Sequence, residues 1–158
     1  METQAERLAV EREVTIAARP ETVWELLTDP AKARTWWGVT FAFDPRPGGV
    51  YSIEVVPGKT VAGEFVELDP PRRLVYTWGW VPDGDGPNLV PPGSSTVEID
   101  LLPTADGTLL RFVHRDLPSP ESVTAHGHGW DHYLPRLAAA AAGDDPGPDP
   151  WVTDGPGV

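Results

Sequence analysis

The pattern of hydrophobic and polar positions changes its period three times along this chain. Residues 10–16 alternate between apolar and charged side chains, which predicts a strand. Residues 20–27 begin with proline and place apolar side chains at helical spacing, and residues 29–36 begin with Asp-Pro, which caps a second short helix. Residues 120–142 return to helical spacing. Between them the period of two predicts six further strands, at 39–43, 50–56, 61–68, 73–80, 96–102 and 108–114.

These elements predict an α+β fold. Six consecutive strands joined by short turns form an antiparallel meander, and with the first strand they make a curved seven-stranded sheet. The long C-terminal helix has one apolar stripe, which must cover one face of that sheet. We expect residues 1–8 to fray, residues 9–142 to form the domain, and the acidic, Pro/Gly-rich residues 143–158 to be disordered. Trp151 in this tail either docks on the body of the domain or stays free.

Three histidines, His126, His128 and His132, lie within seven residues of the predicted last helix. At roughly 100° per residue, His126 shares the apolar stripe with Trp130, whereas His128 and His132 lie on the opposite, solvent side. The spacing of these two suits a metal ion. However, the chain has no cysteine, and Asp131 from the same turn is a poor third ligand. We therefore expect no metal site and no cofactor.

Composition narrows the classes of partner. The 158 residues are enough for one domain, and the formal net charge of −12, with scattered Lys and Arg, argues against a nucleic-acid partner. Without cysteine there is no disulfide framework and no thiol nucleophile. The N-terminus lacks the apolar segment of a signal peptide, and no apolar run is long enough to span a bilayer. We expect a cytoplasmic protein with no membrane partner.

Four segments carry a family resemblance: ARPETVWELLTDPAKARTWWG at 18–38, DPRPGGVY at 44–51, GEFVELDPPRRLVYTW at 63–78, and H-x-x-x-W followed by L-x-x-L at 126–137. In this order they resemble the activator of Hsp90 ATPase homologue 1-like family of the START-like, Bet v 1-like (SRPBCC) superfamily. The resemblance implies a helix-grip fold with a cavity between the concave sheet face and the long helix. Members of that superfamily include lipid and hormone carriers, polyketide cyclases and co-chaperone domains.

Strand parity indicates which side chains face that implied cavity. Leu110, Phe112 and His114 share a face of the last strand, and an aromatic ladder runs along residues 74–80. Trp36 and Trp37 end the second short helix at the implied mouth, where a partly exposed ring would serve as a gate. The candidate ligand-binding residues are Trp37, Tyr51, Phe65, Tyr76, Trp78, Trp80, Phe112, His114, His126, Trp130 and Tyr133. The alternative is that the same rings simply fill a core, with His126 hydrogen-bonded as a structural residue.

The preferred interpretation is a protein that binds a small hydrophobic or aromatic ligand and has no catalytic residue. A second hypothesis is a cyclase- or isomerase-like enzyme in which His114 and His126 act as an acid–base pair. A third is a module that interacts with a chaperone or client protein through a patch near Trp36–Trp37 and the Pro/Gly loop 81–93. That loop is either a lid or an irregular excursion. Whether the chain forms a homodimer stays open.

Overall fold

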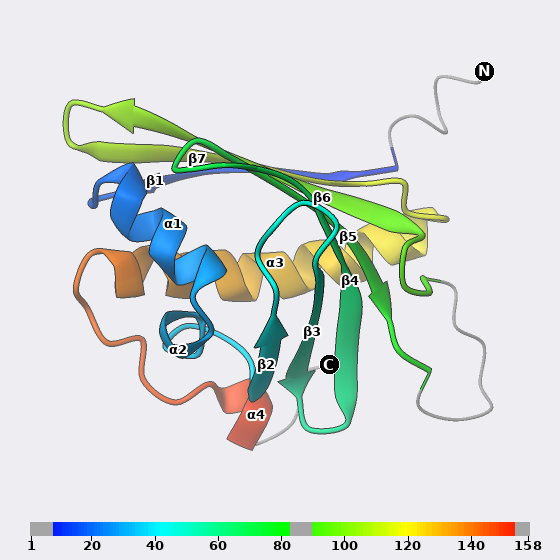
Figure 1. Ribbon diagram of the computed structural model, residues 1–158. Coiled ribbons are helices and arrows are strands. Elements are labelled where there is room, and N and C mark those ends of the chain that lie inside the picture. The colour runs from blue at the N-terminus through cyan, green and yellow to red at the C-terminus, as the bar shows by residue number, and fades with distance from the viewer. Residues whose placement is uncertain (1–7, 83–89, 154–158) are drawn as a thin grey trace.

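The computed structural model describes residues 8–82 and 90–153, and it has the predicted architecture (Figure 1). A seven-stranded antiparallel sheet with the order β1-β7-β6-β5-β4-β3-β2 curls around one long helix. The helix-grip prediction is therefore confirmed. The strands are β1 (Val10–Ile16), β2 (Thr40–Phe43), β3 (Val50–Val56), β4 (Lys59–Asp69), β5 (Arg73–Trp80), β6 (Ser95–Thr104) and β7 (Gly107–Arg115), and the helices are α1 (Pro20–Thr28), α2 (Pro30–Ala33), α3 (Pro120–Ala141) and α4 (Pro150–Thr153).

The short helices α1 and α2 meet at Asp29. The Asp29 backbone N–H closes α1 on Glu25, and its carboxylate accepts a hydrogen bond from the backbone N–H of Ala31 to cap α2. Helix α2 ends at Ala33 and is therefore shorter than the helix predicted over residues 29–36. A turn follows and brings Trp36 and Trp37 under the sheet, with the Trp37 N–H bonded to the Ala33 carbonyl.

The inner face of the sheet is apolar, as the strand parity predicts. The side chains of Val97, Ile99 and Leu101 are buried, and so are those of their cross-strand partners on β7, which are His114, Phe112 and Leu110. Since side chains of neighbouring strands lie opposite one another, these residues form continuous ladders across the sheet. The ladders are the surface on which α3 packs.

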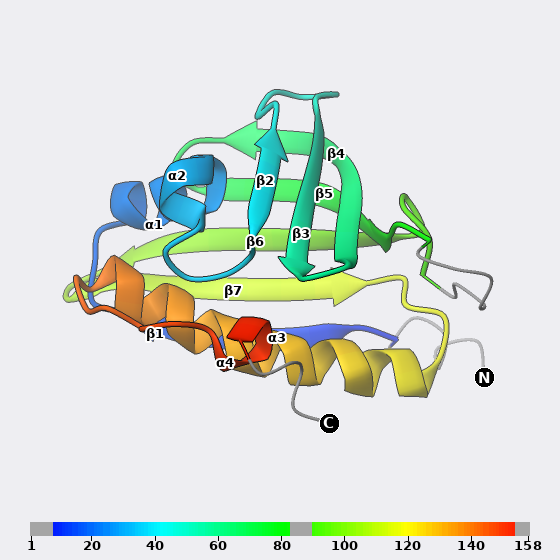
Figure 2. The ribbon, with the colours of Figure 1, turned by 90° about the horizontal axis from the view of Figure 1, so that it is seen from below.

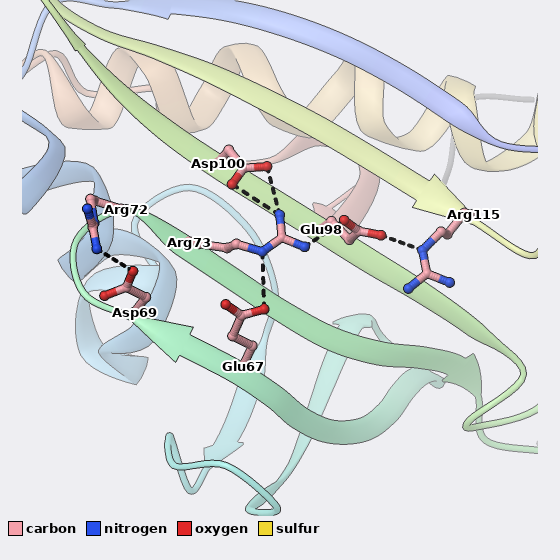
Figure 3. Close-up of polar contacts among 7 residues, drawn as sticks. All are labelled: Glu67, Asp69, Arg72, Arg73, Glu98, Asp100 and Arg115. Atoms are coloured by element: carbon pink, nitrogen blue, oxygen red, sulfur yellow. Dashed lines mark hydrogen bonds and ion pairs between the residues drawn. The ribbon is translucent and has the colours of Figure 1, made fainter.

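The outer face of the sheet carries a network of ion pairs centred on Arg73 (Figure 3). Its guanidinium bonds Glu67 of β4 at 3.1 Å, Glu98 of β6 at 2.8 Å and Asp100 of β6 at 2.9 Å. Glu98 also pairs with Arg115 of β7. Hydrogen bonds from Arg115 and Arg73 hold the pKa of the Glu98 carboxyl below its usual value. The network links four adjacent strands, β4 to β7, on the side away from α3.

Helix α3 begins with the Ser119 hydroxyl accepting a hydrogen bond from the N–H of Ser122. The Arg12 guanidinium of β1 then holds the helix at Asp131 through contacts of 2.7 and 3.1 Å. Pro135 lies within the helix on its exposed side, as predicted, where water can satisfy the carbonyl that its ring leaves without a donor. None of the helices in the described parts of the chain is long and apolar enough to cross a membrane.

The C-terminal segment differs from the disordered tail expected over 143–158. Residues 144–153 turn back along α3 and end in helix α4, beside α3 and β3 (Figures 1 and 2). Trp151 is docked on the body of the domain. The expectations for residues 1–7, 83–89 and 154–158 lie outside the described residues.

Candidate functional site

Ten aromatic side chains form one continuous cluster between the concave sheet face and α3, which we call the aromatic core. Each ring lies within 6.4 Å of another, measured between centroids. Nine of the eleven candidate residues named from the sequence are buried here or directly against it, and only Trp80 and His126 are half-buried. The members are Trp37, Phe41, Phe43, Tyr51, Phe65, Tyr76, Trp78, Phe112, Trp130 and Tyr133.

Trp37 is the central ring of the aromatic core. Its centroid lies 5.6 Å from that of Trp130 on α3 and 5.8 Å from that of Tyr133. It also lies nearly parallel to Trp78 of β5, at 6.3 Å and an interplanar angle of 8°, and it stacks on Trp36 at 4.6 Å. The residue that the sequence places at a cavity mouth thus sits where the sheet, α3 and the α2 turn meet.

The exposed gate expected at Trp36 or Trp37 is absent from this arrangement. The two residues are only 2% and 5% exposed. The Trp36 indole N–H donates to the Leu26 carbonyl at 2.8 Å, which fixes its ring against α1. Contacts with neighbouring aromatic rings stabilise both side chains in these buried positions. An interaction patch built on these two tryptophans is therefore not available on the surface.

His114 is fully buried, and both ring nitrogens have partners. Nδ1 accepts a hydrogen bond from the indole N–H of Trp130 at 3.1 Å, and Nε2 lies 2.9 Å from the Ser95 hydroxyl. Ser95 donates its own proton to the Trp78 carbonyl at 2.9 Å. The proton of His114 must therefore be on Nε2 and point at Ser95. A continuous chain of hydrogen bonds then runs from α3 through His114 to β5.

His126 is held in the opposite tautomer. Its Nδ1 donates to the Ser122 carbonyl at 2.8 Å, because a carbonyl can only accept. Its Nε2 accepts from the indole N–H of Trp80 at 3.1 Å. Burial lowers the pKa of this imidazole, although the bond to Ser122 works in the other direction. Both histidines thus use both nitrogens in bonds within the protein, which leaves neither free to exchange a proton with a substrate.

This arrangement predicts that stability falls in mild acid. Burial, with a smaller contribution from His126, lowers the pKa of His114 to about 2. In the unfolded chain the imidazole takes up a proton below about pH 6.5. The stability that comes from this difference is therefore complete above about pH 6.5 and is lost below it. We expect the free energy of unfolding to fall by about 2 kcal/mol between pH 6.5 and pH 5 from this residue alone.

Urea unfolding at a series of pH values measures this loss. Nitrogen-15 NMR of the imidazoles assigns it, because the His114 ring should keep its neutral Nε2–H signature throughout the range. A His114 ring that titrates near pH 6 in the folded protein would contradict the prediction.

Two indole N–H groups in the aromatic core lack an acceptor. They belong to Trp37 and Trp78, which are 5% and 3% exposed, and no hydrogen-bond partner for either lies in the described part of the chain. A buried donor without a partner costs about 1–3 kcal/mol. The indole groups of Trp36, Trp80 and Trp130 do have partners. Among the buried side-chain nitrogen and oxygen atoms of the described residues, only these two indole nitrogens lack a hydrogen-bond partner.

Several residues of the site were not named from the sequence. Ser95 has the same strand parity as Val97 and Ile99, so its inward direction could have been predicted. Phe41 and Phe43 alternate on β2 in the same way. Asp149, which lies in the acidic tail, carries no comparable signal.

Of the two remaining histidines of α3, His132 is half-buried under the C-terminal segment, whereas His128 lies beside that segment and stays exposed. The His132 ring stacks on Trp151 at 3.9 Å with an interplanar angle of 7°, and the His128 ring lies 5.1 Å from the same indole. The helical wheel placed both side chains correctly on the face away from the sheet. It could not show that the chain returns to cover that face.

A second concave feature lies away from this site, at the far end of the sheet. It is a shallow groove where the start of α1 meets the β4–β5 and β6–β7 turns, lined by residues such as Arg19, Pro71, Arg72 and Asp106. None of the candidate residues named from the sequence lines it.

Comparison with known proteins identifies the family. The model of the family described as Activator of Hsp90 ATPase homolog 1-like protein matches residues 17–142. The solution structure of an AHSA1-like protein from Rhizobium etli is 48% identical, with 90% of this chain and 87% of that chain covered and a TM-score of 0.71. No curated protein matches the chain in sequence.

Two further solved structures share the fold. CalU16 from Micromonospora echinospora is 27% identical over 85% of this chain and 74% of its own, with a TM-score of 0.64. DynU16, a putative protein in the dynemicin biosynthetic locus, is 24% identical over 89% of this chain and 50% of its own, with a TM-score of 0.73. The family-model match and the Rhizobium etli structure confirm the resemblance based on the four sequence segments.

Proposed function

The chain belongs to the Activator of Hsp90 ATPase homolog 1-like family, and from that premise we propose that it binds a small hydrophobic or aromatic molecule between the sheet and α3. The binding site is the aromatic core, and the ligand carries a hydrogen-bond acceptor such as a carbonyl oxygen. No side chain of the chain performs chemistry on the ligand in this proposal.

The observation that carries the proposal is the pair of unpaired indole donors. A site for a small molecule is typically apolar with a few polar groups that fix the orientation of the ligand. Trp37 and Trp78 supply that combination, since their rings are nearly parallel and each retains a free N–H. A ligand that inserts against these rings and accepts from one or both N–H groups removes an existing penalty, which adds to the gain from apolar contact.

The fold neighbour DynU16 is consistent with this ligand class. Its locus is a biosynthetic one, and such loci handle small organic molecules. The likeness at 24% identity concerns the fold, so the neighbour adds no ligand identity. The histidine acid–base alternative has less support, because His114 and His126 have no free ring nitrogen.

A matched pair of probes tests the proposal. 2-Acetylnaphthalene carries a ketone, and 2-isopropenylnaphthalene has the same shape with a methylene group in place of the oxygen. We expect the ketone to bind about tenfold more tightly, because a hydrogen bond to a buried donor contributes roughly 1.4 kcal/mol. Tryptophan fluorescence gives the dissociation constants, and nitrogen-15 NMR of the indole groups should show the resonances of Trp37 and Trp78 shifting most.

Substitution of single tryptophans provides the control. Trp37→Phe and Trp78→Phe should each reduce the preference for the ketone, since each removes one free donor. Trp36→Phe is the matched control, because its N–H is already bonded to Leu26 and its loss should leave the preference unchanged. If the wild-type protein binds neither probe, or binds both equally, the proposed role of the unpaired donors is wrong.

A further inference from the structure

The segment of residues 144–153, which we call the strap, crosses the open side of the curled sheet. After α3 the chain reverses, runs back along α3 and ends in α4, beside the middle of α3 and the end of β3 (Figures 1 and 2). The match to the family model stops at residue 142, so the strap is an addition to the region that this model describes.

One buried carboxylate anchors the strap to α3. Asp149 is 8% exposed, and it accepts hydrogen bonds from the Tyr133 hydroxyl at 2.7 Å and from His132 Nε2 at 2.8 Å. The backbone N–H of Trp151 bonds the same carboxylate at 2.9 Å. The Trp151 ring then stacks on His132. The side chains that hydrogen-bond Asp149 therefore come from two consecutive residues of α3, and the ring of His128 also lies against Trp151.

A second anchor connects the strap to the turn that carries the central tryptophans. The Arg136 guanidinium donates to the carbonyls of Pro146 at 3.2 Å and Gly147 at 2.7 Å. It also donates to the carbonyl of Trp36 at 2.9 Å. Arg136 thus ties the position of the strap to the residue that precedes Trp37.

The strap lies one side chain away from the proposed ligand site. Tyr133 is the link, since its hydroxyl is bonded to Asp149, while its ring contacts Trp37 at 5.8 Å and Trp151 at 5.6 Å. Moving the strap therefore uncovers Tyr133, whose ring is in contact with the Trp37 ring of the aromatic core.

The strap is also the least self-supporting part of the described fold. Helix α4 has four residues, fewer than an isolated helix needs for stability, and the sequence DDPGPDP before it favours no regular structure. A segment held by few contacts opens at a lower free energy than the core on which it rests.

From these contacts we infer that the strap is the cover of the ligand site, held shut by Asp149 and Trp151, and that it lifts to let a ligand enter and leave. The inference rests on the proposed function. Because the strap contacts Tyr133 rather than the unpaired donors, it controls the rates of exchange and leaves the affinity almost unchanged.

The test measures strap motion and ligand exchange separately. The chain has no cysteine, so Thr153→Cys accepts a single nitroxide label whose EPR spectrum reports whether the strap is held. The dye 6-propionyl-2-(dimethylamino)naphthalene, a neutral aromatic ketone, reports entry through its own emission in stopped-flow mixing. Asp149→Asn and Trp151→Ala each remove one part of the anchor. Asp144→Asn is the matched control, since it changes the charge of the strap equally at an exposed position.

In Asp149→Asn and Trp151→Ala we expect a more mobile label and association and dissociation rate constants that both rise about tenfold, with the dissociation constant unchanged within about twofold. Asp144→Asn should behave like the wild type. A label that becomes mobile without faster exchange would overturn the inference while leaving the proposed function intact. A label that stays immobile in both anchor variants would overturn the anchoring. Failure of the wild type to bind the dye would instead count against the proposed function.

Discussion

Replacement of Trp130 by alanine is expected to lower the free energy of unfolding by about 3–5 kcal/mol, the range measured when a large aromatic side chain is removed from a core. Trp130 is 4% exposed, and its ring centroid lies 4.5 Å from Phe112 and 5.1 Å from Trp78. Its indole N–H also donates to His114. The truncation therefore opens a void between α3 and the sheet and leaves a buried nitrogen without its donor.

Two companion variants separate these contributions in urea unfolding at pH 7. Trp130→Phe keeps most of the packing but removes the donor, so it should lose only about 1–3 kcal/mol. Val66→Ala, at a position that is 53% exposed, should change stability by less than about 0.5 kcal/mol. If Trp130→Ala were no more destabilising than Trp130→Phe, the ring packing described above would contribute far less than its burial indicates.

Replacement of Gly63 by alanine is expected to destabilise the protein by about 3 kcal/mol, at the upper end for overpacking of a core. A Cβ atom at this position would lie 2.3 Å from the carbonyl oxygen of Thr77 and 2.6 Å from its hydroxyl. The Tyr51 hydroxyl donates to the same carbonyl at 2.6 Å from the strand on the other side. Since the obstructing atom belongs to the backbone of β5, the strands must move apart to admit the methyl group.

Gly129→Ala is the matched control, because a methyl group there meets no atom within 4 Å. This glycine lies within α3, where alanine is the better helix former, so the variant should gain about 0.5–1 kcal/mol. Thermal and urea unfolding of the two variants side by side should give effects of opposite sign. A Gly63→Ala protein as stable as the wild type would show that β4 and β5 separate easily at this point.

Regular periodicity explains how much of the fold could be predicted from sequence. In β6 and β7 every second residue faces α3, so the directions of Ile99, Phe112 and His114 follow from counting. The stripe of Trp130, Leu134 and Leu137 on α3 follows from the helical period in the same way, and all three are buried. The curved sheet and the helix it encloses are consequences of these two rules together.

The hydrogen-bond partners of the candidate residues did not follow from periodicity. Parity gives the face of the sheet on which His114 lies, but the choice of Ser95 and Trp130 as partners depends on how far α3 is shifted along the sheet. Similarly, Trp36 and Trp37 could be placed at the end of α2, whereas their burial depends on the turn that follows Ala33.

The strap was missed for a different reason. Its attachment comes from single residues, Asp149 and Trp151, in a sequence whose composition is typical of disorder. No repeat of apolar positions marks such a segment, since it packs as an irregular chain against one face of a helix.

The chain of hydrogen bonds through His114 also restricts how α3 can dock. An apolar helix face alone fits a concave apolar sheet in several axial positions of similar energy, because hydrophobic contact is not directional. A slide of α3 by one residue would move the indole of Trp130 by about 1.5 Å along the sheet and disrupt its bond to the His114 nitrogen. Helix slippage would thus leave a buried polar atom without its hydrogen-bond partner. This cost favours one axial position of α3 over the others that apolar packing alone would allow.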